Sequence, residues 1–95
     1  MVKKMTRNEK FYNKMIEIFQ EKQLVVAIEE FTELQKELCK YLRSKKMNNL
    51  TAIAEEIADV KIMLEQLKIF FKIDKCEIEE FKKNKIARTR ERFKI

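Results

Sequence analysis

The sequence contains no glycine and no proline, the residues that most often mark tight turns and hairpins. Histidine and tryptophan are also absent. Without an imidazole, the chain can form neither a histidine-dependent catalytic triad nor a zinc site that combines histidine with cysteine. Long apolar runs are missing as well, because no stretch approaches the roughly 18 apolar residues that span a membrane. Together these absences exclude histidine-based hydrolysis, argue against a membrane partner and favour an all-helical protein.

The two cysteines, Cys39 and Cys76, do not form a CxxC pair. Redox and metal motifs need closely spaced thiols, so neither cysteine is expected to carry chemistry. The N-terminal sequence MVKKMTRNEK lacks the apolar segment of a secretion signal. We therefore expect an unexported, cytoplasmic protein with reduced thiols.

Positive charge is concentrated at the two ends of the chain. The net charge is +6, but residues 1–10 contribute +3 and residues 82–95 contribute +6, which leaves −3 for residues 11–81. Nucleic-acid-binding proteins usually present a broad basic face, so nucleic acid is not the expected partner. The basic C-terminal segment 82–95 either keeps a small protein soluble or contacts phosphate groups of a ligand.

Four helical segments with short connections are expected, which predicts an all-α, four-helix bundle in a single domain of residues 1–95. Thr6 and Asp74 each begin a capping box. The polar loop SKKMNN separates the second and third helices, where either Asn48 or Asn49 can cap the third. The expected helices cover about residues 6–20, 24–43, 49–72 and 74 toward the C-terminus.

Apolar residues repeat at helical spacing in the second and third helices. The seam of the second consists of Leu24, Ile28, Phe31, Leu34, Leu38 and Leu42, and that of the third of Ile53, Ile57, Val60, Leu64 and Leu67. Ile62 and Ile69 lie on the opposite side of the third helix, so this helix is expected to be buried on two sides. One short chain cannot easily cover both, which predicts a homo-oligomer, either a dimer or a tetramer built from dimers.

Acidic side chains lie beside both seams. Glu30, Glu33 and Glu37 share one side of the second helix, and Glu56 and Asp59 lie close to the seam of the third. On many helices such residues simply form a solvated face. If the two helices pack antiparallel, however, the acids converge in one pocket. Unpaired carboxylates near an apolar surface are costly, so that pocket would need a cation.

The expected pocket offers only carboxylate oxygens. A donor set of this kind suits Mg²⁺, or alternatively Mn²⁺. Because Mg²⁺ is usually held by few carboxylates together with water and substrate phosphates, the expected substrate is phosphorylated. The metal would neutralise the phosphoryl oxygens and lower the pKa of an attacking water.

The segments EFTE at 30–33 and EIAD at 56–59, separated by 22 residues, resemble the paired ExxE and ExxD motif of the MazG-like nucleotide pyrophosphohydrolases, in the all-α NTP pyrophosphatase superfamily. The similarity covers about residues 20–92 and includes the phrases QLVVAIEEFTEL and NLTAIAEEIADVKIMLEQL. It implies a Mg²⁺-dependent hydrolase that cleaves a nucleoside triphosphate between its α and β phosphates, releasing a monophosphate and pyrophosphate. The metal ligands that the resemblance implies are Glu30, Glu33, Glu56 and Asp59.

The same resemblance implies roles for residues outside the motif. Either Glu29 or Glu55 would orient or deprotonate the attacking water. The C-terminal sequence KNKIARTRER resembles a segment that contacts phosphates in related proteins. The substrate-binding residues implied in this way are Lys85, Arg88 and Arg92, together with Gln23 near the nucleotide.

Two departures from the family leave the substrate open. The chain is a minimal single module, and without tryptophan or histidine it would have to recognise a base through Phe11, Tyr12, Phe19 or backbone groups. One alternative function is a phosphoribosyl-ATP pyrophosphohydrolase, which shares the architecture and a related acidic motif. The other is a non-catalytic helical interaction module that binds nucleic acid through its basic C-terminus.

Overall fold

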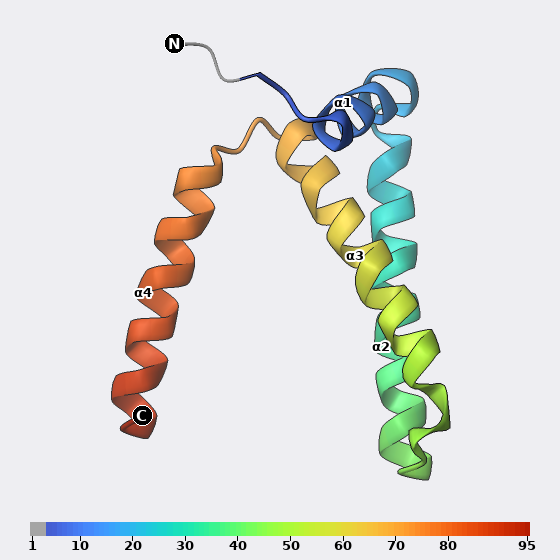
Figure 1. Cartoon of the computed structure of the whole chain (residues 1–95), viewed down its shortest axis with the longest axis vertical. Helices are drawn as coiled ribbons and strands as arrows, with labels where there is room; N and C mark the ends of the chain where they lie inside the picture. Colours follow the sequence, from blue (N-terminus) through green and yellow to red (C-terminus); the bar gives the residue numbers. More distant parts are fainter. Residues whose placement is uncertain (1–3) are drawn as a thin grey trace.

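A computed structural model describes residues 4–95, so the first three residues of the predicted domain 1–95 lie outside it. The described chain is entirely helical, without a β-strand between residues 4 and 95, which confirms the all-α class (Figure 1). Its elements are the α-helices α1 (Arg7–Phe19), α2 (Lys22–Ser44), α3 (Leu50–Phe70) and α4 (Lys75–Phe93), with the short 3-10 helix η1 (Met47–Asn49) before α3. In this part of the chain, no helix combines the length and apolarity needed to cross a membrane.

The capping residues explain where two helices begin. Thr6 accepts a hydrogen bond from the backbone N–H of Glu9, and the Glu9 carboxylate accepts one from the backbone N–H of Thr6, which confirms the predicted capping box. Asp74 caps α4 by accepting a hydrogen bond from the backbone N–H of Cys76 at 2.8 Å. The prediction for α3 was wrong for Asn49, whose side chain makes no capping bond. The side chain of Asn48 lies outside the described part of the chain.

The turns use left-handed backbone conformations without glycine. Gln20, Lys45 and Lys72 follow α1, α2 and α3 with φ values of 49°, 56° and 54°. Each such residue costs roughly 1 kcal/mol relative to a right-handed conformation. Long polar side chains tolerate these positions because all three are exposed.

α2 and α3 form an antiparallel hairpin, and α1 packs across α3 and the start of α2 (Figure 1). The hairpin interior is small. Its buried apolar residues are Ala27, 1% exposed, and Met63, 5% exposed. One helical turn away from them lies a buried pair of amides, in which Gln23 Nε2 donates a hydrogen bond of 2.8 Å to Gln66 Oε1.

The helix faces that meet differ from the predicted seams. Ile28 of α2 is 64% exposed, and Ile57 and Leu64 of α3 are 45% and 44% exposed, so these residues do not form the core. Each helix instead turns a mixed face toward the other, with a residue every three or four positions. The buried and half-buried residues on these faces include Gln23, Ala27, Glu30, Leu34 and Glu37 of α2 and Glu56, Asp59, Met63 and Gln66 of α3.

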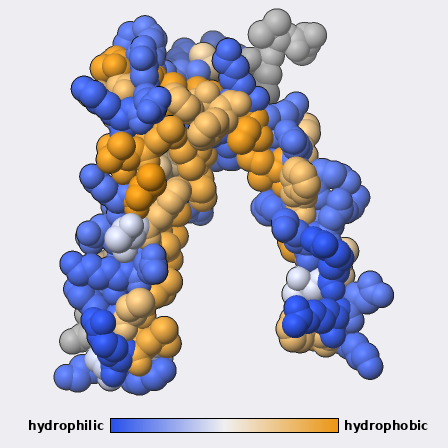
Figure 2. All heavy atoms as spheres, turned by 180° about the vertical axis from the view of Figure 1, so that it is seen from behind, coloured by the Kyte–Doolittle hydropathy of each residue, from blue (hydrophilic) through white to orange (hydrophobic). Residues whose placement is uncertain are grey.

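The physical reason is that small and hydrogen-bonding residues allow a closer approach than leucine does. Ala27 lets the helices come together, and the Gln23–Gln66 hydrogen bond satisfies the polar groups that this approach buries. Part of each apolar seam is consequently left exposed, whereas other seam residues, such as Leu34, stay half-buried. Figure 2 shows the result as a band of hydrophobic surface along the α2–α3 arm, on the side turned toward α4.

α4 stands apart as a separate arm (Figure 1). It has no extended packing against the other helices, and all of its side chains except Ile78 are exposed. The radius of gyration is 16.6 Å, whereas a compact chain of this length would have about 12 Å. The predicted four-helix bundle is therefore not formed within one chain, because three helices pack and the fourth does not.

Candidate metal centre

Three acidic side chains meet in the α2–α3 hairpin. Glu30 of α2 and Glu56 and Asp59 of α3 each place a carboxylate oxygen within 4.8 Å of the others. All three are half-buried, because they lie on the faces that the two helices turn toward each other. We call these three residues the carboxylate cluster. The structure thus brings together three of the four predicted metal ligands.

Glu33, the fourth predicted ligand, lies at the edge of the cluster. Its side chain is exposed, one helical turn after Glu30. Its negative charge nevertheless raises the pKa of both Glu30 and Glu56, so it is close to both carboxylates.

Burial and like charge raise the pKa values of the cluster. Desolvation is the main cause for Glu30, whose pKa is raised further by the charge of Asp59, by a hydrogen bond with Asp59 and by the charge of Glu56. Desolvation is also the main cause of the raised pKa of Glu56, followed by the charge of Asp59. Desolvation and repulsion between like charges therefore both disfavour the ionised carboxylates in the cluster. A bound cation would relieve both effects.

One oxygen of the cluster has no hydrogen-bond partner. Glu56 Oε2 is buried, and no group among the described residues donates to it. Buried polar atoms are normally paired, so an unpaired carboxylate oxygen indicates a missing partner such as a water or an ion. This oxygen belongs to a residue on the face that α3 turns toward α2.

Glu37 shows how the same helix treats a carboxylate that has partners. Glu37 accepts hydrogen bonds of 3.2 Å from both the Asn49 amide and the Lys40 ammonium group. These two bonds lower the pKa of Glu37, whereas the pKa of Glu30 is raised. Desolvation thus dominates the pKa of Glu30, whereas hydrogen bonds from Asn49 and Lys40 outweigh desolvation at Glu37.

Cations are paired with acids elsewhere in the molecule. Within residues 4–95, the ion pairs are Lys14–Glu17, Lys40–Glu37, Lys68–Glu65 and Lys82–Glu79. None of them includes a member of the carboxylate cluster. The cluster is therefore the place in the described chain where negative charge is gathered without a protein cation.

The donor atoms fit a small divalent ion. Two oxygens on opposite sides of Mg²⁺ lie about 4.2 Å apart, because each Mg–O distance is about 2.1 Å. At most one of the three oxygen pairs can be opposite, and the other pairs would be neighbours about 3.0 Å apart. The cluster oxygens lie within 4.8 Å of one another, so binding one ion would need a closure of up to about 1.8 Å. Three carboxylates also leave coordination positions for water and phosphate oxygens, which Mg²⁺ usually retains.

The other residues that the sequence analysis selected lie in different surroundings. Glu29 and Glu55 are exposed, and the charge of Glu55 contributes to the raised pKa of Glu56. Gln23 is buried, with its amide bonded to Gln66 rather than open to a ligand. Lys85, Arg88 and Arg92, which we call the basic strip, line a shallow pocket of about 420 Å³ with Thr89 on α4. Within one chain, the structure does not bring this strip to the carboxylate cluster.

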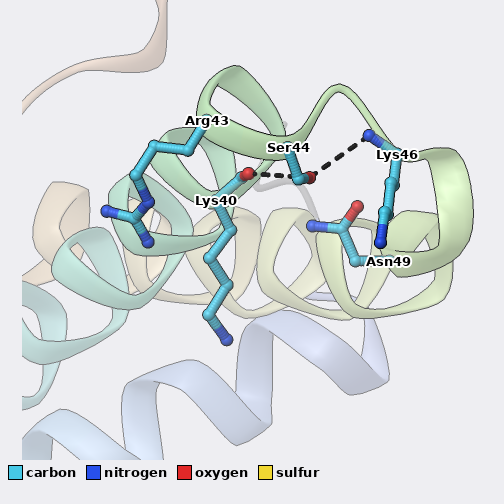
Figure 3. Close-up of a pocket in the computed structure, with 5 residues that line it drawn as sticks. All are labelled: Lys40, Arg43, Ser44, Lys46 and Asn49. Atoms are coloured by element: carbon cyan, nitrogen blue, oxygen red, sulfur yellow. Dashed lines mark hydrogen bonds between the residues drawn. The ribbon is translucent and has the colours of Figure 1, made fainter.

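A second group of cations, which the sequence analysis missed, surrounds the turn between α2 and α3. Lys40, Arg43, Ser44, Lys46 and Asn49 line a pocket of about 390 Å³ (Figure 3). Ser44 closes the turn by donating a hydrogen bond to the Lys40 carbonyl and accepting one from the Lys46 N–H. Lys40 follows Glu33 by seven residues, or about 10 Å along the helix. Lys40 therefore lies about 15 Å along α2 from Glu30 of the carboxylate cluster, and these cations form a separate group at the turn.

Comparison of the chain with protein-family models, with curated proteins and with solved structures finds no match. The functional assignment therefore depends on the carboxylate cluster and its surroundings.

Proposed function

We propose that this protein is a Mg²⁺-dependent nucleoside triphosphate pyrophosphohydrolase of the MazG-like type, which converts a nucleoside or deoxynucleoside triphosphate to the monophosphate and pyrophosphate. Mn²⁺ would serve in place of Mg²⁺, since both prefer oxygen ligands. The observation that carries the proposal is the buried, unpaired Glu56 Oε2 in a group of three half-buried carboxylates.

Two further observations support a phosphorylated substrate. All-carboxylate sites that hold Mg²⁺ usually complete its coordination with substrate phosphates. Positive side chains also lie further along α2, at the turn lined by Lys40 and Arg43, about 15 to 20 Å from Glu30. A phosphorylated substrate that binds the metal and extends along α2 toward this turn would approach these cations.

The side chains have distinct roles in this proposal. Glu30, Glu56 and Asp59 hold the metal, and Glu33 joins them from the edge. When bound, the ion would neutralise phosphoryl oxygens and lower the pKa of the attacking water. Glu29 and Glu55, both exposed, are the two candidates for accepting the proton of that water.

The test is pyrophosphate release from a panel of canonical and damaged NTPs and dNTPs with Mg²⁺ or Mn²⁺. We expect Glu56→Gln and Asp59→Asn to lose activity by about 100-fold or more, since even outer-shell partners of a metal are worth 10- to 100-fold. The matched control is Glu65→Gln, an exposed carboxylate on α3 that is paired with Lys68. This control should retain wild-type activity and all variants should retain their helical circular dichroism.

Three results would change the assignment. Full activity in both Glu56→Gln and Asp59→Asn would remove the carboxylate cluster from the mechanism. Activity on phosphoribosyl-ATP without activity on ordinary triphosphates would replace the substrate. A wild-type protein that releases no pyrophosphate from any of these substrates would favour a non-catalytic helical module.

A further inference from the structure

We infer that the turn between α2 and α3 is a phosphate-binding site separate from the carboxylate cluster. In this site the side chains of Lys40, Arg43 and Lys46 bind the anionic oxygens of a phosphate group, and Asn49 accepts a hydrogen bond from a hydroxyl of the same ligand. We call the pocket around these residues the turn site. The inference goes beyond the proposed function, because the turn site requires neither a metal nor hydrolysis.

The first observation is a local excess of positive charge in an acidic part of the chain. Residues 11–81 carry −3 in total, but residues 38–54 contain four cations and no acid. The four cations are Lys40, Arg43, Lys45 and Lys46. Within residues 4–95, Lys40 pairs with Glu37 and the other three form no ion pair. Lys40 itself keeps two N–H donors beyond the one that faces Glu37, because an ammonium group has three.

The second observation is that three of these cations line a concave surface. Lys40, Arg43 and Lys46 surround a pocket of about 390 Å³ together with Ser44 and Asn49 (Figure 3). Small-molecule sites usually measure about 300 to 1,000 Å³. The three cationic side chains are exposed, so their charged groups can turn toward a ligand. A phosphate group suits them, because a guanidinium can donate two parallel hydrogen bonds to its oxygens.

Attraction to the end of α2 accounts for only part of this group. Cations near a helix C-terminus interact favourably with its carbonyl groups, which explains Arg43 in the last turn. The nearby carbonyls already have donors, however. The Tyr41 carbonyl accepts a hydrogen bond from the Lys45 N–H at 2.6 Å, and the Lys40 carbonyl accepts one from the Ser44 hydroxyl at 3.1 Å. Lys46, which lies beyond the end of α2, is therefore left to bind a ligand.

The third observation is an unpaired acceptor in the lining of the turn site. Asn49 Nδ2 donates hydrogen bonds to the Glu37 carboxylate at 3.2 Å and to the Glu37 carbonyl at 3.4 Å, which fixes the orientation of the amide. Asn49 Oδ1 is buried and accepts no hydrogen bond from the described residues. Buried acceptors are normally paired, so this oxygen indicates a missing donor. We expect a ligand hydroxyl to supply it when the exposed Lys46 side chain turns toward the phosphate.

Lys45 provides a matched cation that is close to the turn site but outside it. Its backbone is left-handed, with a φ of 56°, and its ammonium group lies 5.7 Å from the centre of the Tyr41 ring. Lys45 is not among the residues that line the pocket. Replacing it therefore changes the charge of the turn without removing a group of the site.

The first experiment locates phosphate on the full chain without metal. ¹⁵N-labelled protein in EDTA is titrated with sodium phosphate at constant ionic strength, at a pH where phosphate carries two negative charges. We expect saturable shifts that are largest at the backbone amides of Ser44, Lys46 and Asn49. Shifts of equal size at all basic residues, or shifts that are largest on the basic strip of α4, would overturn the inference.

Sodium sulfate is the matched anion for the role of Asn49. Sulfate has nearly the same size and the same charge, but it has no hydroxyl to donate. We expect phosphate to bind about 5-fold more tightly than sulfate, the difference that one ordinary hydrogen bond makes. Equal affinity for the two anions would overturn the assignment of Asn49 as an acceptor for the ligand.

Single substitutions test the cations one at a time. Arg43→Gln and Lys46→Gln should each weaken phosphate binding about 10-fold, because each removes a charge-assisted hydrogen bond. Lys45→Gln removes the same charge from a side chain outside the pocket and should weaken binding by about 2-fold or less, since salt screens its effect. Thermal unfolding checks that the variants are folded. Equal losses in all three would show attraction to net charge alone and would overturn the inference.

The phosphate group can belong to a free molecule or to a lipid headgroup. Leu42 and Met47 are exposed beside the cations of the turn site, so a bilayer is tested as well. The probe is sedimentation with phosphatidylcholine vesicles that either contain or lack phosphatidic acid. Sedimentation that needs phosphatidic acid and is lost in Arg43→Gln and Lys46→Gln would support a lipid ligand. Binding of inorganic phosphate without sedimentation would support a free phosphorylated ligand, and neither form of binding would overturn the inference.

The titration also separates the inference from the proposed function. Glu56→Gln should bind phosphate at the turn site as the wild type does, because Lys40 lies about 15 Å along α2 from the carboxylate cluster. Phosphate binding at the turn site of a protein that releases no pyrophosphate would support the inference and overturn the proposed function. An active protein whose turn amides do not respond to phosphate would keep the proposed function and overturn the inference.

Discussion

α3 and α4 are of similar length, 21 and 19 residues, but their surroundings differ completely. α3 packs against both α1 and α2, and it places two acids and two neutral residues at the centre of this contact. α4 has no such contact and carries most of the positive charge of the C-terminal segment. The difference teaches that local sequence suffices to make a helix, whereas packing of the whole chain decides which side chains become buried.

A consequence is that the interior of this protein is partly acidic and its exterior is partly apolar. Glu30 and Glu56 lie between helices, while Ile28 and Leu64 lie on the surface. An arrangement of this kind is stable only if the acids between the helices are neutralised and the exposed apolar residues are covered. The following four predictions test each half of this contrast, in order of decreasing effect.

Metal binding should stabilise the α2–α3 hairpin. A metal present at 100 times its Kd adds about 2.7 kcal/mol to the free energy of unfolding. We expect this increase with Mg²⁺ or Mn²⁺ in urea unfolding followed by circular dichroism, because the ion relieves the repulsion within the carboxylate cluster. The double variant Glu56→Gln/Asp59→Asn should show no response, and an equal response in that variant would place the ion elsewhere.

Breaking the buried amide pair should destabilise the same hairpin. In Gln66→Leu, the Gln23 amide loses its 2.8 Å hydrogen bond while it stays buried, which costs about 1 to 3 kcal/mol. The double variant Gln23→Leu/Gln66→Leu should recover most of this loss, because replacing both partners leaves no unsatisfied group. Thermal unfolding of both variants without metal checks the prediction. A double variant that is as unstable as the single one would show that shape, rather than hydrogen bonding, sets the cost.

Removing a helix cap should affect α1 and α4 differently. Thr6→Ala should lower the free energy of unfolding by about 1 kcal/mol, since α1 packs on α3. At concentrations where the chain is a monomer, Asp74→Ala should reduce helix content without moving the cooperative transition of α1–α3. The comparison uses circular dichroism for helix content and near-ultraviolet tyrosine absorption for packing, because Tyr12 lies in α1 and Tyr41 in α2. Equal shifts of the transition for both variants would mean that α4 is packed after all.

The smallest effect should be a dependence of stability on pH. The folded state raises the pKa values of Glu30 and Glu56 above the ordinary 4.5, so it binds protons more tightly than the unfolded chain. Their contribution to stability is therefore present below pH 4.5 and is lost as the pH rises through the raised pKa values. The lowered pKa of Glu37 has the opposite effect on stability, because its contribution is present above pH 4.5 and is lost as the pH falls below that value.

The metal-free protein should accordingly melt at a higher temperature near pH 5 than at pH 7. With saturating Mg²⁺ the order should reverse, because protons compete with the metal for the same oxygens. Calorimetric scans at constant ionic strength, with EDTA or with Mg²⁺, make the comparison. A metal-free melting temperature that falls steadily from pH 7 to pH 5 would contradict the raised pKa values.

Much of the secondary structure could be predicted because it depends on neighbouring residues. The capping box at Thr6, the cap at Asp74 and the polar loop before Asn49 are local signals, and each marks a helix end in the structure. The convergence of Glu30 with Glu56 and Asp59 also followed from helical spacing and an antiparallel turn. These features can be predicted without knowing how the rest of the chain packs.

The packing faces could not be predicted in this way. Counting apolar residues favours the leucine-rich seams as the interior, but Ala27 and the Gln23–Gln66 bond let a more polar face approach closely. The helical spacing of Glu56, Asp59, Met63 and Gln66 is visible in the sequence. It was not predicted as a contact face because the leucine-rich seams were expected to form the interior. Lys72, with a φ of 54°, lies in the junction between α3 and α4, and no local pattern in the sequence predicts the direction that α4 takes.

The Gln23–Gln66 hydrogen bond also determines how far α3 can slide along α2. An interior of leucine alone tolerates a shift by one turn, since one apolar contact replaces another. A shift here would leave two buried amides unsatisfied, so alternative registers carry a penalty that the native register does not. The two uncharged side chains thus fix the register of α3 on α2. This register in turn sets the spacing of the carboxylates, on which any chemistry of this hairpin depends, although neither glutamine has to contact a ligand.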